Sequence, residues 1–345
     1  MAGILTNSEP RIVAIGGGSG TSVLLRGLKA LTPHLTAIVT MFDSGGSSGI
    51  LRREFGYPPL GDIRQCLLAL ADDSDPGTAA LRTAFDFRFS SSSSLNGHSL
   101  GNLVLAALTS INHGVEGAIT ELAPLLRMTG RVTPVTLENA DLCAELADGS
   151  IIRSESAIDL RGTETPAIRR VFLDRHVRAN PVAIDAILDA DAVVLGPGDL
   201  YTSIVPNLLA DGVPEALSKT GARLIYVCNL MTKRGETGDY DAADFAQAIV
   251  KHLDGRKLDY AIVNTESVPD RVLRAYAREG AQPVDPDGER LLEFTRNVVH
   301  GQLTNLGPPL RHDSTKLAEI VAGLAAAHHE HEAERPTAVL HGASD

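Results

Sequence analysis

Arg11-Ile12-Val13-Ala14-Ile15, followed directly by Gly16-Gly17-Gly18-Ser19-Gly20, is the stretch that decides how this chain folds. The β-branched run predicts a buried strand, the glycines predict a tight turn, and apolar residues then recur at helical spacing from 23 to 28. A helix that opens from a glycine-rich turn offers free backbone N–H groups and a positive dipole end. The stretch therefore predicts a strand, a turn and a helix that can bind an anion such as phosphate.

Four further apolar runs repeat this pattern and define the fold class. They occupy residues 35–42, 191–195, 224–228 and 260–264, and each is followed by a loop and then a helical pattern. Strands that alternate with helices form parallel sheets that are covered on both faces. We therefore predict an α/β fold with a Rossmann-like, doubly wound parallel sheet of at least five strands and helices on both faces.

A central segment and the C-terminal residues differ from this pattern. Residues 131–136, 142–146 and 151–152 alternate between apolar and polar, and Ala147-Asp148-Gly149-Ser150 is typical of a hairpin turn. We predict a small antiparallel and helical insert over about residues 130–180, within a single domain that spans residues 10–327. Residues 328–345 contain three histidines and several acidic residues, and they predict a flexible tail.

Composition excludes several classes of partner. The 31 Lys and Arg residues against 43 Asp and Glu residues give a net charge of −12, which disfavours nucleic acids and anionic membrane surfaces. The apolar runs are too short to cross a bilayer, so membrane insertion is not expected. Cys66, Cys143 and Cys228 form no C-x-x-C pair, which disfavours a zinc ribbon or a disulfide scaffold and favours the cytoplasm.

A second polar loop, Asp43-Ser44-Gly45-Gly46-Ser47-Ser48-Gly49, follows the strand predicted at 35–42. In a doubly wound sheet this loop lies beside the first one, at the edge where such sheets bind ligands. Serine hydroxyls and backbone N–H groups suit phosphate oxygens. The two loops therefore predict one shared site for a phosphorylated ligand, and a plain Asx turn at Asp43 is the structural alternative.

Two acidic residues are the candidates for chemistry. Asp43 ends the second strand, and Asp62 starts an amphipathic helix, where its ordinary role is an N-cap. If the intervening chain folds back over the first two loops, Asp43 and Asp62 form a carboxylate pair that could hold Mg²⁺ against a diphosphate. We therefore assign both catalysis and metal binding to Asp43 and Asp62, and Mg²⁺ is the one cofactor that they suggest.

Two later loops repeat the polar pattern at strand ends. Gly196-Pro197-Gly198-Asp199 follows the strand predicted at 191–195, and Asn229 to Thr232 follow the strand predicted at 224–228. An earlier motif, Gly97-His98-Ser99-Leu100-Gly101-Asn102, precedes an apolar helix, where a lone histidine is more often structural than catalytic. Purely structural sheets do not need polar, glycine-rich loops at so many strand ends.

Together these motifs resemble the YvcK proteins, the so-called gluconeogenesis factors, within the superfamily of the 2-phospho-L-lactate transferase CofD. The resemblance covers residues 11–313 and rests on GGGSG at 16–20, GGSSG at 45–49, GDIR at 61–64, GHSLGN at 97–102, GPGDLYTS at 196–203 and YVCNLMT at 226–232. It implies a Rossmann-like sheet, a site for UDP-N-acetylglucosamine, and a part in cell shape and envelope synthesis on gluconeogenic carbon sources.

The CofD branch of the superfamily implies a different activity. It uses Mg²⁺ to transfer a phospholactyl group from a guanosine-diphosphate-linked donor to a deazaflavin, with two acidic positions in its metal site. Asp43 matches the first aspartate of the Asp-Asp-Gly-Gly pattern of that family, whereas Ser44 stands at the second position, and Asp62 matches another acidic position. A split site formed by Asp43 and Asp62 therefore stays open.

On this basis the sequence assigns the ligand to the ends of the predicted strands. The expected ligand-binding residues are Gly16, Gly17, Gly18, Ser19, Gly20, Thr21, Ser44, Gly45, Gly46, Ser47, Ser48, His98, Asn102, Gly196, Pro197, Gly198, Asp199, Tyr201, Asn229 and Thr232. The first loop and Ser47 and Ser48 would hold the diphosphate, and the nucleoside and sugar would lie toward the loops at 196–203 and 229–232.

Three functions follow, in order of preference. The first is a cytoplasmic regulator that binds a nucleotide sugar of the UDP-N-acetylglucosamine type, and the second is a Mg²⁺-dependent CofD-like phospholactate transferase. The third, a dinucleotide-dependent oxidoreductase with Asp43 as the ribose acid, is disfavoured because Thr21 breaks the G-x-G-x-x-G fingerprint. The oligomeric state stays open, and a homodimer is the assembly that an exposed sheet edge would favour.

Overall fold

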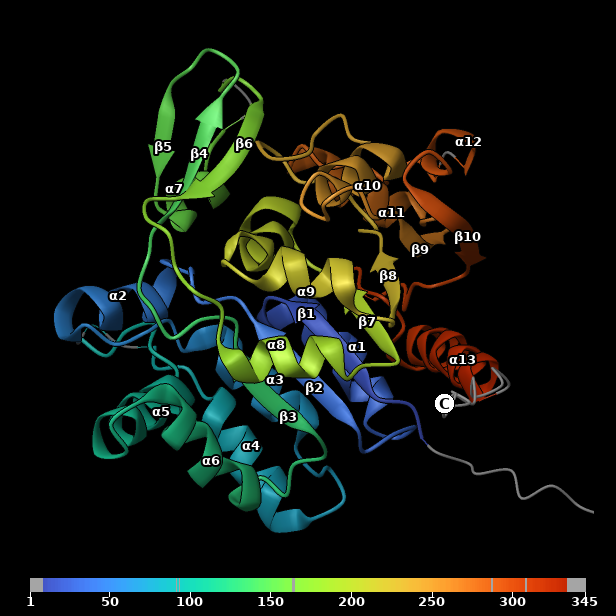
Figure 1. The fold of residues 1–345 in the computed structure, drawn as a ribbon. Coiled ribbons are helices and arrows are strands. Elements are labelled where there is room, and N and C mark those ends of the chain that lie inside the picture. The colour runs from blue at the N-terminus through green and yellow to red at the C-terminus, as the bar shows by residue number, and fades with distance from the viewer. Residues whose placement is uncertain are drawn as a thin grey trace, which may run out of the picture.

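A seven-stranded parallel sheet forms the centre of the molecule (Figure 1). The computed structural model describes residues 9–333 except 91, 93, 163, 164, 287 and 308, with side chains described up to residue 327. In spatial order the strands are β10 (Thr295–Gly301), β9 (Leu258–Asn264), β8 (Arg223–Val227), β7 (Ala192–Leu195), β1 (Ile12–Gly16), β2 (Leu35–Val39) and β3 (Arg131–Pro134). The predicted doubly wound α/β fold is confirmed.

The order of the strands reverses between β1 and β7. The chain moves outward from β1 to β2 and β3 on one side, and from β7 to β8, β9 and β10 on the other. Every residue of β1 and β7 is buried, because helices cover both faces of the sheet. In sheets of this kind the ligand site lies beyond the carboxyl ends of the strands at the reversal, so the topology selects one edge of the sheet.

Helices cover the two faces of this sheet (Figure 1). On one face α1 (Gly18–Leu28) packs between α3 (Gly61–Leu70) and α13 (Ser314–Ala333). On the other face α8 (Pro181–Leu188) packs beside α9 (Val213–Lys219). The remaining helices are α2 (Gly46–Phe55), α4 (Pro76–Asp86), α5 (Leu100–Ile111), α6 (Val115–Leu125), α7 (Glu155–Asp159), α10 (Ala242–Val250), α11 (Asp270–Arg278) and α12 (Gly288–Leu291), with a π turn η1 (Leu200–Ile204) and a 3₁₀ turn η2 (Val205–Leu209).

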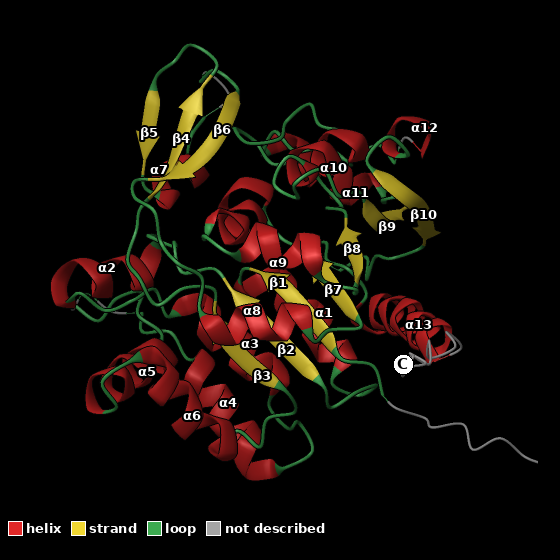
Figure 2. Ribbon diagram, viewed as in Figure 1, coloured by secondary structure: helices red, strands yellow, loops and turns green. Residues whose placement is uncertain are grey.

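A small antiparallel sheet with α7 at its base stands apart from the main sheet and forms the insert (Figure 2). Its strands, in the order β5-β4-β6, are β5 (Ile151–Arg153), β4 (Leu142–Leu146) and β6 (Ile168–Leu173). The hairpin predicted at 147–150 joins β4 to β5, as expected. The prediction that 131–136 belongs to the insert is wrong, because β3 pairs in parallel with β2 at the edge of the main sheet. A short strand at a sheet edge alternates much as a hairpin strand does.

Helix α13 continues six residues beyond the domain end predicted at 327, through Ala333. The rest of the tail, residues 334–345, and the side chains of His328, His329 and His331 lie outside the described residues. Among the helices that the structure describes, none combines the length and the apolar character needed to cross a membrane.

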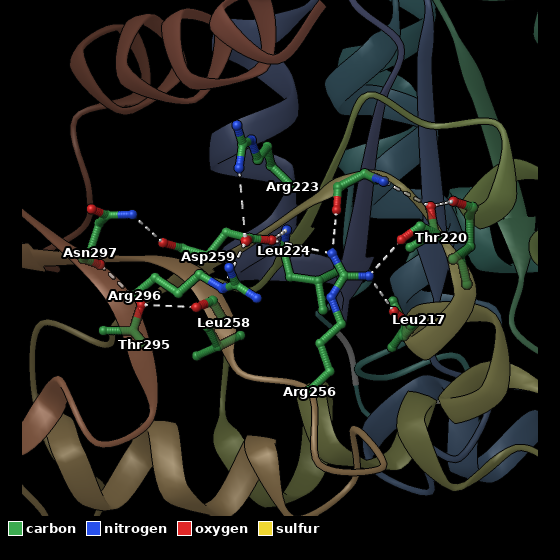
Figure 3. Close-up of polar contacts among 12 residues, drawn as sticks. Leu217, Thr220, Arg223, Leu224, Arg256, Leu258, Asp259, Thr295, Arg296 and Asn297 are labelled. Carbon is green, nitrogen blue, oxygen red and sulfur yellow. Dashed lines mark hydrogen bonds and ion pairs between the residues drawn. The ribbon is translucent and has the colours of Figure 1, made fainter. Parts of the chain in front are cut away.

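Paired charges stabilise the amino-terminal edge of the sheet (Figure 3). The buried carboxylate of Asp259, near the start of β9, accepts hydrogen bonds from the backbone N–H of Leu224 at 2.9 Å and from Arg256 at 3.2 Å. Arg223 and Arg296 lie 4.0 and 3.5 Å from its other oxygen. The Arg256 guanidinium also donates to the backbone carbonyls of Leu217, Thr220 and Ala222. This network ties the end of α9 to β8 and β9.

Candidate functional site

The loops after β1 and β7 touch at the carboxyl edge of the main sheet. A Cβ atom built on Gly20 would lie 2.1 Å from the carbonyl oxygen of Pro197, and one built on Gly17 would lie 2.7 Å from Oγ of Ser203. Only glycine leaves room for so close an approach. The structure thus brings together two loops that lie about 180 residues apart in the chain, as the parallel-sheet prediction required.

Asp62, at the start of α3, packs directly against the first glycine loop. A Cβ on Gly18 would lie 2.5 Å from Oδ1 and 2.8 Å from Cα of Asp62, and the backbone amide of Gly18 donates a hydrogen bond to the carboxylate. The glycines at 17 and 18 therefore let α1 approach α3. Because a carboxylate already interacts with the N-terminus of α1, this helix end is less open to a phosphate than the sequence alone indicates.

The Asp62 carboxylate has too little positive charge around it to balance its negative charge. Burial, and after it the neighbouring Asp43 carboxylate, raise the pKa of Asp62 to about 7, against the lowering effect of the Gly18 amide. Arg64, a cation that lowers this pKa, is itself buried and donates to Asp86 at 2.5 Å and to Asn102 at 3.1 Å. The structure thus brings the predicted pair of Asp43 and Asp62 together, and nearby cations neutralise its negative charge only in part.

Asp43 organises the second loop. Its Oδ1 accepts a hydrogen bond from the backbone N–H of Gly45 at 2.7 Å, which is the Asx turn expected as the structural alternative. Its other oxygen lies 3.6 Å from the place where a Cβ of Gly61 would stand, next to Asp62. The turn directs the chain into α2, so Asp43 has a structural role and still faces the site.

Glu155, at the start of α7 in the insert, is a member of this cluster that the sequence reasoning missed. Its Oε2 accepts a hydrogen bond from the backbone N–H of Ser44 at 3.1 Å, and Ser156 beside it donates its N–H to Oγ of Ser44 at 2.9 Å. Burial and then Asp43 raise the pKa of Glu155 to about 8. An acidic residue in the first turn of a short helix is ordinary, so no sequence signal linked it to the site.

The donor set of this cluster suits a hard divalent cation. Asp43 and Asp62 offer carboxylate oxygens, the ligands that Mg²⁺ prefers, and the raised pKa of Asp62 marks a place where positive charge is lacking. Asp43 and Asp62 are the residues that would hold the ion. Once bound, Mg²⁺ would supply the charge that neutralises a diphosphate.

The predicted residues Ser47, Ser48, His98 and Asn102 are buried and bond to other protein groups. Oγ of Ser47 lies 2.9 Å from Nδ1 of His98, and Oγ of Ser48 accepts the backbone N–H of Gly61 at 3.0 Å. Oδ1 of Asn102 accepts from Arg64. These side chains connect α2, α3 and α5, and their predicted contact with a ligand stays a prediction.

On the other side of the strand reversal, the loops after β7 and β8 are bonded to each other. Nδ2 of Asn229 donates to the carbonyl of Gly198 at 2.9 Å, and Oγ1 of Thr232 accepts the backbone N–H of Gln282 at 3.0 Å. The hydroxyl groups of Tyr201 and Tyr240 lie 2.7 Å apart. A cavity of about 660 Å³ opens beside these loops and is bordered by Asp199, Thr232 and the insert residues 159–162.

Comparison with known proteins agrees with this architecture. The family model of the 2-phospho-L-lactate transferase CofD matches residues 12–304. The gluconeogenesis factor of Bacillus subtilis (strain 168) is 43% identical over 318 residues, which is 92% of this chain and 98% of that protein. The gluconeogenesis factor of Halalkalibacterium halodurans is 41% identical over 315 residues, covering 91% of this chain and 96% of that protein.

A solved structure extends the likeness to three dimensions. The crystal structure of a Bacillus halodurans protein matches with a TM-score of 0.86 at 40% sequence identity, over 91% of this chain and 99% of that one. The similarity therefore includes both the parallel sheet and nearly all of the surrounding helices and loops.

Proposed function

This chain belongs to the family of the 2-phospho-L-lactate transferase CofD and is similar throughout to gluconeogenesis factors, and we propose that it acts as one by binding a nucleotide sugar of the UDP-N-acetylglucosamine type. The observation that carries the proposal is the meeting of glycine-rich and acidic loops at the carboxyl edge of the sheet, around Asp43 and Asp62. The family resemblance suggests the identity of the nucleotide sugar.

The N-terminus of α2 is the place that best supports binding of the diphosphate. The first N–H groups of a helix have no acceptor within it, and α2 begins at Gly46. Apart from the adjacent chain, no heavy atom lies within 4 Å of the position that a Cβ of Gly46 would take, so the space on that side of Gly46 is open. Mg²⁺ held by Asp43 and Asp62 would offset the repulsion between the carboxylates and the phosphates.

Calorimetric titration with UDP-N-acetylglucosamine, with and without Mg²⁺, tests the proposal. We expect binding that Mg²⁺ strengthens. The blocking variant is Gly45→Val, because the backbone there is extended (φ −89°) and a Cβ would meet only ordinary contacts at 3.4 Å or more, so the protein should fold. Gly323→Val on α13, where a Cβ meets nothing within 4 Å, is the matched control.

We expect Gly45→Val to weaken binding at least about tenfold, equivalent to about 1.4 kcal/mol, and Gly323→Val to leave it unchanged. Absence of heat with the wild-type protein at millimolar ligand would overturn the proposed function. Full affinity in Gly45→Val would instead move the ligand away from α2. Gly18→Val is not a clean probe, because its side chain would collide with the backbone of Asp62.

The proposed cellular role is a part in cell shape and envelope synthesis during growth on gluconeogenic carbon sources, from the cytoplasm. Its support is the similarity to the Bacillus subtilis gluconeogenesis factor. Expression in a Bacillus subtilis strain that lacks its own factor should restore growth and normal cell shape on such a carbon source, with the protein in the cytosolic fraction. A strain that expresses Gly45→Val should stay defective. Equal rescue by both proteins would show that the cellular role does not require ligand binding at α2.

A second candidate function is supported by the acidic cluster. Asp43 and Asp62, with Glu155 nearby, form the acidic site that a Mg²⁺-dependent phospholactate transferase of the CofD type would need. The test is product formation from a guanosine-diphosphate-linked phospholactyl donor and a deazaflavin acceptor in the presence of Mg²⁺. Asp62→Asn should abolish turnover, and undiminished turnover in that variant would exclude the assigned role of Asp62.

A further inference from the structure

Lys233, in the loop after β8, lies at the junction of the insert and the main sheet. Its ammonium group contacts three carboxylates: Asp159 at the end of α7, Asp199 at 2.7 Å and Glu236 at 2.9 Å. These carboxylates come from the insert, from the loop after β7 and from the loop after β8 itself. One side chain therefore joins three segments that are far apart in the sequence.

The three carboxylates lie close enough to hold a metal ion. One oxygen from each of Asp159, Asp199 and Glu236 lies within 4.8 Å of the others. The Glu236 side chain is completely buried (0% exposed), and among the described residues its oxygens have no hydrogen-bond partner. Lys233 forms an ion pair with this carboxylate, and the Arg161 guanidinium interacts with it electrostatically. A buried carboxylate without hydrogen bonds is strongly destabilising unless a cation faces it, so this cluster requires one.

We propose that Lys233 is a built-in cation that replaces a divalent metal at this junction and clamps the insert onto the main sheet as the outer wall of the adjacent cavity. The three carboxylates hold Lys233 in its charged form and, against the opposing effect of burial, raise the pKa of the ammonium group. The positive charge of Lys233 thus helps to hold the insert on the main sheet, and this contact does not require a bound metal ion.

The charges around the cavity indicate which part of a ligand it would take. Three acidic residues (Asp159, Asp199, Glu279) and three basic residues (Arg161, Lys233, Arg234) line it, so its charges balance. Leu160, Met231 and Tyr276 add apolar surface. Balanced walls of this kind suit an uncharged polar group, and we assign the cavity to the sugar of the nucleotide sugar. This assignment rests on the proposed function, whereas the clamp does not.

Thermal unfolding of the full chain with and without Ca²⁺ tests the clamp. In Lys233→Met we expect a melting temperature several degrees below wild type, because three converging carboxylates lose their cation. We expect Ca²⁺ at millimolar concentration to restore most of that loss, as an ion enters the vacated place. Lys233→Arg should melt near the wild-type temperature. The double variant Lys233→Met/Glu236→Gln should show no rise in melting temperature with Ca²⁺ beyond the shift that Ca²⁺ causes in wild type.

Two results would overturn the clamp: a Lys233→Met protein that melts like wild type, or one in which Ca²⁺ produces no more than the wild-type shift. If Lys233→Met accumulates only as insoluble protein, Asp159→Asn provides the second measurement. That variant weakens only the contact of the insert with Lys233, whereas the Ser44 contacts of the insert remain. Limited proteolysis should therefore cut residues 142–173 faster than in wild type while the main sheet stays intact. Unchanged proteolysis would also overturn the clamp.

The ligand assignment has its own readout, the ratio of affinities for UDP-N-acetylglucosamine and UDP. Wild type should prefer the sugar nucleotide, and Asp159→Asn should lose this preference by about fivefold or more while its affinity for UDP stays within about twofold, a difference near 1 kcal/mol. An unchanged ratio would overturn the assignment of the sugar to the cavity. If wild type binds neither ligand, the proposed function fails, and the Ca²⁺ experiment still decides the clamp.

Discussion

The two ends of the strands in the main sheet surround their carboxylates with opposite charges. At the amino-terminal edge, Asp259 faces Arg223, Arg256 and Arg296 and accepts a backbone N–H (Figure 3). At the carboxyl edge, Asp62 faces Asp43, and burial and this like charge raise its pKa to about 7. A compensated charge stabilises the fold, whereas an uncompensated one is retained at a cost in stability and marks where a cation or ligand belongs.

The difference follows from how the two edges are built. Short turns that enter the strands meet at the amino-terminal edge, where Arg256 caps the carbonyl groups at the end of α9. At the carboxyl edge, long glycine-rich loops leave the strands, and the helix ends that follow them present N–H groups. The compensated charges and the proposed binding site therefore lie at opposite ends of the strands of one sheet.

The largest expected effect is from removing the compensated charge. Asp259→Ala leaves Arg256 and the Leu224 amide without their buried acceptor, and we expect it to lower the free energy of unfolding by about 3 kcal/mol. Urea unfolding measures this. Nucleotide-sugar affinity of the folded fraction should stay unchanged, because the edge lies opposite the site. A stability change under about 1 kcal/mol would mean that this network is not the main contributor to stability at this edge.

Removing the uncompensated charge of Asp62 should change the free energy of unfolding in the opposite direction. The folded pKa of Asp62, about 7, is above its unfolded value of 3.8, so its ionisation opposes folding and wild-type stability falls as the pH rises between these values. Asp62→Asn should raise stability at pH 8 by about 1 to 2 kcal/mol, allowing for partial solvent screening, and leave it unchanged below pH 4. Urea unfolding at the two pH values measures the difference.

The same variant should lose function while it gains stability. We expect Asp62→Asn to abolish the strengthening of ligand binding by Mg²⁺, because one of the two oxygen donors becomes a neutral amide. A variant that is less stable than wild type at pH 8 would contradict the view that Asp62 is uncompensated, since it would show that the carboxylate stabilises the N-terminus of α1.

A smaller effect of the same kind is expected at Glu155. Its folded pKa of about 8 is also above the ordinary 4.5, so its charge destabilises the fold as the pH rises through this range. Glu155→Gln keeps an oxygen for the Ser44 amide and should gain less than about 1 kcal/mol at pH 9, with no change at pH 4. Equal stability of both proteins at pH 9 would show that neither burial nor the Asp43 charge makes ionised Glu155 unfavourable in the folded protein.

The smallest expected effect concerns an exposed partner of Asp259. The Arg296 side chain is 68% exposed and lies 3.5 Å from the carboxylate, so Arg296→Ala should change stability by at most about 0.5 kcal/mol. Urea unfolding of Arg296→Ala and Asp259→Ala, measured side by side, compares the two losses of stability. A loss comparable to that of Asp259→Ala would mean that the exposed arginine, and not the buried Arg256, compensates the charge.

Local patterns predicted most of the fold. The apolar runs predicted at 11–15, 191–195 and 224–228 correspond to β1, β7 and β8, which are fully or largely buried, and the hairpin at 147–150 formed as its turn residues indicated. The strand at 131–134 was misplaced, because the partner of an edge strand is chosen by long-range packing. The helical end at Ala333 was missed because acidic and histidine residues hide the continuation of α13.

The site was predicted at the level of loops but not of individual roles. Asp43 and Asp62 were expected to meet, and they do, whereas Glu155, Asp159 and Glu236 gave no signal because each lies in an ordinary polar context. Ligand contact by Ser47, Ser48, His98 and Asn102 stays a prediction, and the structure adds that their side chains form buried hydrogen bonds with neighbouring elements. Hydrogen-bond partners across the chain decide such roles, and a motif does not contain them.

The sequence by itself determined the parallel α/β sheet, the meeting of glycine-rich loops at the carboxyl ends of its strands and the family, because hydrophobic periodicity and glycine-rich turns are local properties. Only the tertiary structure decided which charges are compensated. Three contacts illustrate this, and each joins residues more than 15 positions apart. They are the contact of Asp62 with the N-terminus of α1, the carboxyl pair of Asp43 and Glu155, and the contact of Lys233 with Asp159. Electrostatic energy depends on distance and burial, and both quantities exist only after the chain has folded.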